Sequence, residues 1–355
     1  QLAASSKDNT DENWGIVVVQ IDSIGYAKHE PAAGNLYGSD KVRYRYIDAW
    51  SAYTTWGYLD PPISGDSIYI PAGNIVYLDV SPPPLVLIVI EGTLIFSDLK
   101  TIDLQAQYIV LHNGGKLQIG TEMKPHQNKA SIILSGKRRA YEIPIYGAKV
   151  LASRGGILDL HGKPSTSITK LRRTAQRNSK VIFVQRQLPW ENMKGKRIII
   201  TSTTYWQDEA EEHTVVAYSK SSGRVKLAEA LRFSHFGSIY ETPSTAQNIK
   251  TNSSYTAATT SFIDMRAEVS VVDRNIRIEG NKVDGQYGAH VFIHSPFGSK
   301  HSAIARIENV AFRNVGQAFS IGRYPIYLHS LGESGALSYV KNCMIYKSYN
   351  RGLVL

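Results

Sequence analysis

The chain has 355 residues, and 43% of them are hydrophobic, so it can bury a substantial core and is not an intrinsically disordered protein. Its longest apolar run, residues 85–90, has the length of a strand and is far shorter than the roughly 20 residues that a membrane-spanning helix needs. The single cysteine, Cys343, excludes an internal disulfide framework and a cysteine-based zinc site.

The formal net charge is +10, and basic residues gather in the clusters "GKRRA", "KLRRTAQR" and "KGKR". A positive surface favours anionic partners, whether nucleic acid, anionic lipid or acidic polysaccharide. Aromatic residues are not interleaved with these clusters as a base-stacking surface requires, which argues against nucleic acid as a partner. We expect the clusters to be solvated loops between strands, with polysaccharide binding as the alternative.

The N-terminal segment, residues 1–50, is left unassigned. Its first residues, "QLAASSKDNTDENW", lack the apolar core of a signal peptide, so we expect any export signal to be removed or to lie upstream. Further along, apolar residues recur at every second position or in short β-branched runs, as in "DSIYIP", "LVLIVIEGTLIF", "YIVLHNGGKLQI" and "GGILDLHG". Hardly any stretch keeps a helical period, so the sequence predicts an all-β chain.

Glycine spacing favours one all-β architecture over the others. An alternating strand follows Gly92, Gly114 and Gly155, and "ARIENVAFRNVG" and "SYVKNCMIYKSYNRG" each join two short strands through an asparagine or glycine. Such units resemble the coils of a parallel β-helix, in which each rung buries apolar side chains under the next. The last residues, "NRGLVL", look like the start of a further rung, so we expect the natural protein to continue past Leu355.

Two asparagines hold equivalent places in these units. Asn309 lies in "IENVAF" and Asn342 in "VKNCMI". Asparagine tolerates the left-handed backbone conformation, and its side chain can bond the backbone of a neighbouring coil. The sequence therefore predicts an asparagine position at a β-helix corner, with two ordinary turn residues as the alternative.

A family resemblance begins at Trp56 and rests on the order of its landmarks. These stand in "TWGYLDPPISGDSIYIPAGN", "LQAQYIVLHNGGKLQIGTE" and "YGAKVLASRGGILDLHGKPS", which together closely resemble the G8 domain. Downstream, "NVGQAF" and "GRYPIYLHSLGE" look like the β-helix segment that follows G8 in the fibrocystin and fibrocystin-like receptors and, more distantly, in the cell-migration-inducing hyaluronidases.

The resemblance implies a G8 β-rich domain that continues into a right-handed parallel β-helix, a solenoid like that of pectate lyases. We expect a G8 domain at residues 51–177, a connecting β region at 178–260, and the first coils of the β-helix at 261–355. Hyaluronidase-type relatives carry an extra globular module after the "LHG" segment. Only residues 162–189 separate His161 from "WENMKGKRIIITSTTYW", so we expect that module to be missing.

A second departure concerns the segment "YPIYLH", residues 324–329. Where the hyaluronidase-type segment has two histidines two positions apart, this chain has Tyr327 and His329. Residues two apart in a strand share a face, so a histidine pair would suit metal ligation or acid/base work. Tyrosine, with a pKa of about 10, is a poor ligand and a slow base at neutral pH. We therefore expect His329 to be a hydrogen-bonded structural residue.

Two candidate sites stay open beside this expectation. His294 and His329 could meet across adjacent rungs and hold a metal ion together with Asp284 or Glu333. The acidic segment "TSTTYWQDEAEEHTV" contains Asp208 and Glu212, which could serve glycoside cleavage together with His329 if the two carboxylates lie across a groove. We expect the acidic segment to be a solvated loop.

Arg154 and Asp159 could face a polysaccharide, although an outward polar stripe is favoured for them. Asn252 begins an N-glycosylation sequon in a Ser/Thr-rich stretch, which would suit a secreted chain. No cofactor is expected, although calcium in Asp-rich turns stays open.

Two functions follow from the resemblance. The favoured one is a non-catalytic extracellular structural and interaction module of a large fibrocystin-like glycoprotein on a cell or ciliary surface. Its partners would be other extracellular or cell-surface proteins, and a segment outside this chain would attach it to the membrane. The alternative is binding or depolymerisation of a hyaluronan-type polysaccharide, which would make the chain a glycoside hydrolase.

Overall fold

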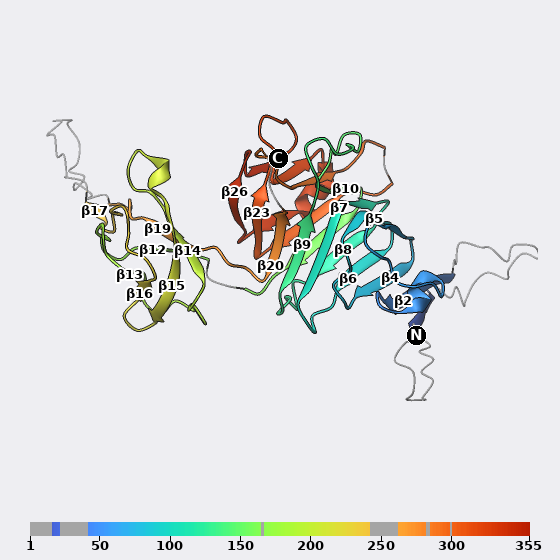
Figure 1. Ribbon diagram of the computed structural model, residues 1–355, viewed down its shortest axis with the longest axis horizontal. Coiled ribbons are helices and arrows are strands. Elements are labelled where there is room, and N and C mark those ends of the chain that lie inside the picture. Colours follow the sequence, from blue (N-terminus) through green and yellow to red (C-terminus); the bar gives the residue numbers. More distant parts are fainter. Residues whose placement is uncertain (1–15, 22–41, 165–166, 242–261, 282–284, 299) are drawn as a thin grey trace, which may run out of the picture. The chain divides into compact units, whose positions relative to one another are not determined.

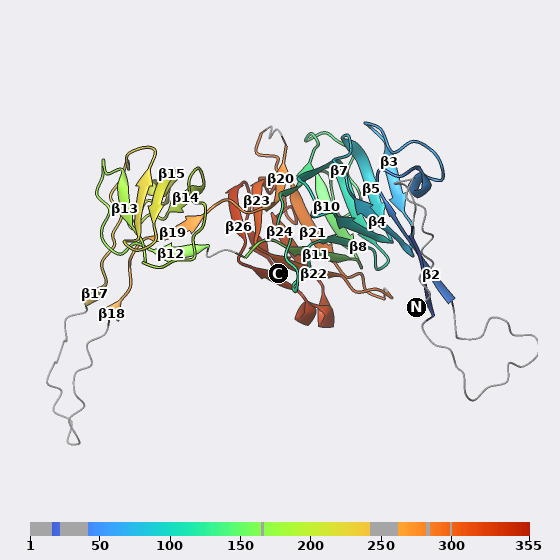
Figure 2. The ribbon, with the colours of Figure 1, turned by 90° about the horizontal axis from the view of Figure 1, so that it is seen from below.

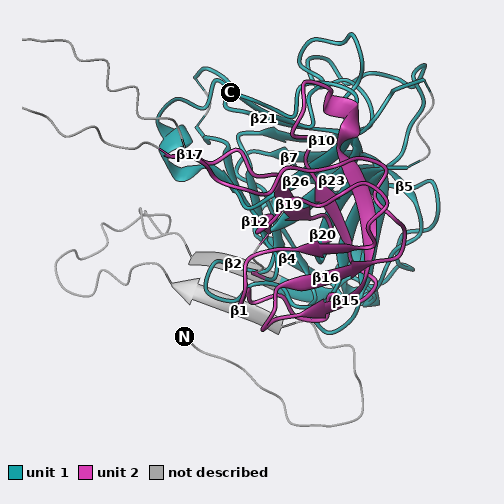
Figure 3. Cartoon of the chain, turned by 90° about the vertical axis from the view of Figure 1, so that its left-hand side faces the viewer, with its two compact units in different colours: residues 1–163, 274–355 teal, residues 164–273 magenta. Residues whose placement is uncertain are grey.

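The computed structural model describes residues 16–21, 42–164, 167–241, 262–281, 285–298 and 300–355. The chain forms two compact units (Figure 3): unit 1 contains Gln1–Lys163 and Arg274–Leu355, and unit 2 contains Pro164–Asp273. Throughout the described ranges the helices are short 3-10 turns, η1 (Tyr53–Trp56), η2 (Gln207–Glu209) and η3 (Gly332–Leu337), and no described helix is long and apolar enough to cross a bilayer. The prediction of an all-β chain is confirmed.

Unit 1 is a solenoid whose strands stack into three walls (Figures 1 and 2). Wall 1 stacks β2 (Val42–Ala49), β4 (Asn74–Leu78), β6 (Thr93–Phe96), β8 (Lys116–Ile119), β11 (Ile157–His161), β22 (Ile304–Glu308) and β25 (Tyr339–Lys341), with β1 (Ile16–Ile21) antiparallel to β2. Wall 2 stacks the first half of β7 (Ile102–His112) with β9 (Ala130–Leu134), β20 (Ile276–Gly280), β23 (Val310–Val315) and β26 (Met344–Ser348). Wall 3 stacks β3 (Ser67–Ile70), β5 (Leu85–Ile90), the second half of β7, β10 (Val150–Arg154), β21 (His290–His294), β24 (Ile326–His329) and β27 (Leu353–Val354).

The same circuit recurs along the chain. The strands β9, β10 and β11 visit walls 2, 3 and 1 in turn, and β20, β21 and β22 repeat that order one level further along. Each strand pairs in parallel with its counterpart in the neighbouring coil, β9 with β20, β10 with β21, and β11 with β22. Unit 1 is therefore one parallel β-helix, as predicted.

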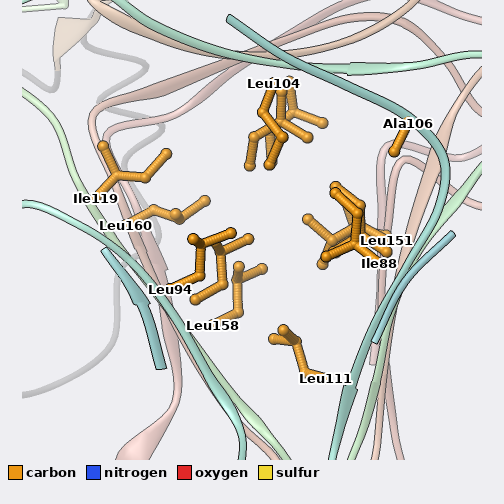
Figure 4. Close-up of a cluster of buried hydrophobic side chains, with 14 of the residues drawn as sticks. Ile88, Leu94, Leu104, Ala106, Leu111, Ile119, Leu151, Leu158 and Leu160 are labelled. Carbon is orange, nitrogen blue, oxygen red and sulfur yellow. The ribbon is translucent and has the colours of Figure 1, made fainter. Parts of the chain in front are cut away.

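Alternating side chains explain why the coils stack. In β6 and β8 every second residue is buried, so one face of each strand points into the solenoid. The register places Leu94, Leu117 and Leu158 in one column, so like apolar groups stack from coil to coil. Figure 4 shows side chains from the three walls meeting in the interior. Full burial of one leucine contributes about 1.5 to 3 kcal/mol, so these columns are the main source of stability.

One corner of the solenoid, between walls 1 and 2, carries the asparagines. Asn309 and Asn342 both have left-handed backbones, with φ of 56° and 53°. The Asn309 side-chain amide donates to the Gly162 carbonyl at 3.2 Å, and the Asn342 amide donates to the Asn309 side-chain oxygen. The predicted asparagine corner is confirmed, because each side chain bonds the coil next to it.

Unit 2 leaves the solenoid at this same corner. The Lys163 amide donates to the Asn275 side-chain oxygen at 2.8 Å, so the two ends of the insertion lie together. The predicted boundaries at residues 178 and 260 therefore differ from the boundaries of the compact unit, which fall at 164 and 273. The absence of the extra hyaluronidase-type module stays a prediction, and the residues between the "LHG" segment and Trp190 contribute β12 and β13 to the compact unit.

Unit 2 has its own antiparallel sheet and its own core. The sheet contains, in order, β12 (Ile168–Lys170), β19 (Glu268–Val271), β14 (Arg197–Ile200), β15 (Glu211–Ser219), β16 (Arg224–Leu227) and β13 (Val181–Phe183), and a separate pair joins β17 (Tyr240–Glu241) to β18 (Phe262–Ile263). Its buried side chains include Trp190, Ile198, Val215, Val225 and Val269.

Candidate functional site

A polar row crosses the outer face of wall 3 in unit 1. The register aligns His112 with Arg154, Arg154 with His294, and His294 with His329. Glu91 extends the row, because its carboxylate lies 2.7 Å from Nδ1 of His112. We call Glu91, His112, Arg154, His294 and His329 the polar row. These residues end or directly follow successive strands, which is why consecutive coils bring them side by side.

At one end of the row, Glu91 accepts three hydrogen bonds. The Tyr69 hydroxyl donates at 2.7 Å, the Asn113 amide donates at 2.9 Å, and His112 contributes the third. The Tyr69 hydroxyl is the main cause that lowers the pKa of Glu91 below its usual value, and His112 adds to it. The carboxylate is therefore ionised at neutral pH and does not act as a general acid there.

At the other end of the row, each histidine is held by a tyrosine. Nδ1 of His329 lies 2.8 Å from the Tyr327 hydroxyl, and Nδ1 of His294 lies 3.0 Å from the Tyr146 hydroxyl. Phe292 stacks on Tyr327, with ring centroids 4.9 Å apart. The bonding of His329 fits the structural role expected from the sequence, because Tyr327 and its neighbours fix the orientation of the ring.

The two imidazoles of the row are close to each other. The ring centroids of His294 and His329 lie 5.3 Å apart, and both rings are half-buried. Burial, followed by the neighbouring His329 and Arg154, lowers the pKa of His294, so its ring is neutral at pH 7. The sequence expectation that His294 and His329 could meet across adjacent rungs matches this geometry. The described residues hold no group of three or more His, Cys, Asp or Glu side chains suited to a metal ion.

The remaining wall 3 histidine, His290, is structural. It is fully buried, and burial lowers its pKa to about 3. Its Nε2 donates to the Tyr146 carbonyl at 2.8 Å, and its Nδ1 accepts from the Gln317 side chain at 3.2 Å. Both ring nitrogens are therefore satisfied, and His290 does not join His294 at the surface.

The polar row does not place two carboxylates across a reacting bond. Glu91 is its carboxylate, and four strand spacings of about 4.8 Å put it about 19 Å from His329. Glycoside hydrolysis with two carboxylates needs them roughly 5 to 9.5 Å apart. The row can bind and orient a polar ligand, but its described side chains lack this acid/base pair.

The other predicted catalytic residues lie in unit 2, whereas His329 lies in unit 1, so neither unit contains all three. Asp208 lies in the exposed turn η2, as expected for a solvated loop. Glu212 is exposed on β15 and accepts a bond from Arg197 at 2.9 Å. The sequence expectations for Asn252 and Asp284 fall outside the described residues.

Glu211 in unit 2 is buried, although the sequence predicted a solvated loop for the acidic segment that contains it. It accepts backbone hydrogen bonds from Arg232 and Phe233 at 2.9 and 2.8 Å, and it lies 3.1 Å from His235 Nε2 and 3.2 Å from His213 Nε2. Burial opposes its charge, but these donors outweigh burial and lower its pKa to about 2. Glu211 therefore ties β15 to the segment after β16.

Asp159 belongs to a charge network on wall 1. Its carboxylate accepts from His161 Nε2 at 2.8 Å and pairs with Lys116 Nζ at 2.7 Å. Glu308 lies 3.8 Å from the other nitrogen of His161 and 3.1 Å from Lys341. Asp159 and His161 are buried, so this network fastens neighbouring coils and is not the open polysaccharide contact that was the weaker expectation.

Comparison with known proteins identifies the family. The sequence matches the G8 domain over residues 55–172 and the CEMIP beta-helix over residues 286–355. It is 34% identical to human fibrocystin-L over 384 residues, which include 98% of this chain, and 30% identical to mouse fibrocystin over 331 residues, which include 87% of it. The chain belongs to the G8-domain family of fibrocystin-like proteins.

The similarity to hyaluronidases is more limited. Human cell surface hyaluronidase CEMIP2 is 30% identical over 153 residues, which include 39% of this chain and 9% of that protein. The chain spans 8% of the length of fibrocystin-L and of fibrocystin. On the fold, the G8 domain begins at η1 and ends just beyond β12, and the CEMIP beta-helix match covers β21 to β27.

The polar row of this G8-domain protein could have been found from its sequence. Its strand endings read "VIEG", "VLHN", "LASRG", "VFIHS" and "YLHS", each with a polar residue directly after the apolar positions. Aligning these endings would have placed Glu91 and His112 beside Arg154. The tyrosine partner Tyr146 had no such signal, because it lies in the loop before β10 rather than in a strand.

Proposed function

We propose that this segment is a non-catalytic structural and interaction module of a fibrocystin-like glycoprotein on the cell surface, including the ciliary surface. The similarity to fibrocystin-L across nearly the whole segment supports this proposal, and so does a relative named for the cell surface. Other extracellular proteins are its partners, and a segment outside this chain attaches the protein to the membrane. The stacked coils serve as a stiff scaffold.

One observation carries the non-catalytic assignment. Tyr327 stands beside His329, where the hyaluronidase-type pattern has a second histidine, and its hydroxyl occupies Nδ1 of His329. The carboxylate of the polar row, Glu91, lies far from this pair and is held by Tyr69, Asn113 and His112. These contacts support a face that is fixed by internal hydrogen bonds rather than poised for proton transfer.

Depolymerisation of hyaluronan is the second candidate function, because CEMIP2 is similar to this chain and is named a hyaluronidase. An incubation of the whole chain with long hyaluronan, with and without Ca²⁺, distinguishes the non-catalytic module from the depolymerising enzyme. The length of the polymer is followed by light scattering after size exclusion. We expect no shortening by the wild type, Asp208→Asn or His329→Ala.

Shortening by the wild type that is lost in His329→Ala and kept in the matched variant His112→Ala would overturn the proposal. His112 suits this comparison because it belongs to the same row and lies two strands away from the His294 and His329 pair.

For the glycoprotein assignment, Asn252→Gln produced in a secreting cell should lose the mass of one glycan.

A further inference from the structure

Exposed basic residues of unit 2 gather on β16 and in the segments beside it. In β16, Arg224 and Lys226 are exposed and alternate with buried Val225 and Leu227, so both cationic side chains point away from the core. The register places Phe183 of β13 directly opposite Arg224. Residues opposite each other in a sheet share a face, so this face includes the Phe183 ring.

A third cation is fixed on the same face. The guanidinium carbon of Arg173 lies 3.3 Å from the centroid of the Phe183 ring. A guanidinium over an aromatic face is attracted by the ring electrons, and the stacking holds its orientation. Arg173, Arg224 and Lys226 therefore lie close together, since neighbouring strands are about 5 Å apart and alternate residues of one strand about 7 Å apart.

Three more cations lie around the strands. Arg172 donates to the Ser222 carbonyl at 2.9 Å, which places it at the turn between β15 and β16, and exposed Lys220 belongs to that same turn. At the opposite end of β16, the Leu227 amide donates to the carbonyl of exposed Lys180. We call this set the basic face: Arg172, Arg173, Lys180, Lys220, Arg224 and Lys226.

The positive charge of the basic face is not neutralised within the described part of the chain. None of its six cations lies within the 4.0 Å ion-pair distance of a described carboxylate. Two carboxylates of unit 2 pair with other cations, Glu212 with Arg197 and Asp264 with Arg266. Exposed cations that are held close together without counter-charges repel one another, and an anionic ligand relieves that repulsion.

The arrangement selects among anionic ligands. Arg173 lies over the Phe183 ring, which disfavours the stacking of a nucleic acid base on that side of the ring. The face is made of strands and carries no amphipathic helix that would insert into a lipid surface. Cations on backbone positions about 5 to 7 Å apart suit a polymer with closely spaced anions. Arginine also binds oxyanions through two parallel hydrogen bonds.

We infer that the basic face of unit 2 is a binding site for a sulfated polysaccharide. Sulfate groups supply several anions per sugar repeat, whereas hyaluronan carries one carboxylate per disaccharide and fits the cation spacing less well. This site is separate from the polar row of unit 1, so it does not depend on whether that row is catalytic.

The test compares two double variants of the whole chain that lose the same charge. Arg224→Ser with Lys226→Ser removes two cations of the basic face, and Lys100→Ser with Lys129→Ser removes two exposed cations of unit 1. Binding to heparin is measured by titration and by elution from immobilised heparin in a salt gradient. We expect the basic-face variant to bind about 10-fold more weakly and to elute at lower salt, and the unit 1 variant to behave as the wild type.

Equal weakening in both variants would overturn the inference, because it would show attraction by net charge alone. No binding of the wild type to heparin would do so as well. Tighter binding to hyaluronan, or to vesicles that contain phosphatidylserine, than to heparin would assign the face to a different ligand. Hydrogen exchange of unit 2 peptides shows whether the variants are folded, and Arg173→Lys provides a second variant that keeps the charge and loses the fixed geometry.

Discussion

Replacing Glu211 by glutamine tests whether a buried anion holds unit 2 together. The substitution keeps the size of the side chain and removes its charge. It also turns one acceptor into a donor that faces the amides of Arg232 and Phe233 and the ring nitrogens of His213 and His235. A buried donor that faces other donors loses its hydrogen bonds and keeps the cost of its desolvation.

The magnitude follows from the pKa of Glu211, which falls from 4.5 to about 2. Each pKa unit corresponds to about 1.4 kcal/mol, so the charged form contributes up to about 3 kcal/mol. Arg232 is exposed, so solvent screens part of this interaction, and we expect a loss of about 2 kcal/mol. Because the folded pKa is lowered, this stability is present above pH 4.5 and is lost as the pH falls toward 2.

The assay is hydrogen exchange of the whole chain at pH 7, read on peptides of β14, β15 and β16. A loss of 2 kcal/mol speeds exchange through unit 2 opening about 30-fold in Glu211→Gln. The matched control is Glu212→Gln, because its exposed ion pair with Arg197 contributes at most about 1 kcal/mol. Equal effects of the two substitutions, or faster exchange in unit 1 alone, would contradict the reasoning.

Three further predictions concern unit 1. Lys149 is fully buried, its Nζ donates to the Asn281 and Tyr287 carbonyls, and burial lowers its pKa to about 8. The free energy of unfolding should therefore rise by about 1 to 2 kcal/mol between pH 8 and 10, because the unfolded chain keeps the Lys149 ammonium proton to a higher pH than the folded chain. Denaturant titration of Lys149→Met should not show this rise. Asn309→Ala should cost about 2 kcal/mol in denaturant unfolding, because it loses the bond to Gly162 and strains a left-handed backbone, whereas Asn309→Gly should cost about half as much. Tyr327→His should bind Zn²⁺ at least 10-fold more tightly than the wild type in calorimetric titration, and the gain should vanish when His329→Ala is added; equal binding by the wild type would show that Tyr327 does not disrupt the pair.

Most of the solenoid was predictable, because the signals that define it are local. The alternating pattern of "GTLIFSD" and "GGKLQIGT" gives the buried stripe of β6 and β8, and the repeated placement of Asn309 and Asn342 gives the corner. Periodicity of two specifies a strand face, and a repeated unit specifies stacking. These features need no knowledge of distant contacts.

The boundaries of unit 2 were not predictable in the same way. The sequence from residue 164 to 177 is mostly polar, as are the turns of the solenoid, so composition does not change at residue 164. What separates the two units is pairing: β11 pairs with β22 across the whole insertion, whereas β12 pairs with β19 inside it. Such pairing between distant segments leaves no mark in a single sequence.

The site was predictable only in part, for the same reason. The pairing of His294 with His329 follows from stacking equivalent strands, and strand equivalence was visible in the sequence. The cluster around Glu211 was not visible, because the amides of Arg232 and Phe233 come from a segment without regular structure. The acidic run around Glu211 therefore looked uniform, although one of its carboxylates is buried and its neighbour Glu212 is exposed.

The hydrogen bond between Lys163 and Asn275 holds the two ends of the insertion together, so unit 2 can change without a change in the β-helix. Because the chain leaves and re-enters the β-helix at one corner, residues added or lost between these points do not change which coil stacks on which. In the next coil a single residue, Asn309, links wall 1 to wall 2 at this corner, where the whole of unit 2 is inserted in the coil before. A lineage could therefore exchange, enlarge or delete the inserted unit, and with it the basic face, while the β-helix keeps its register.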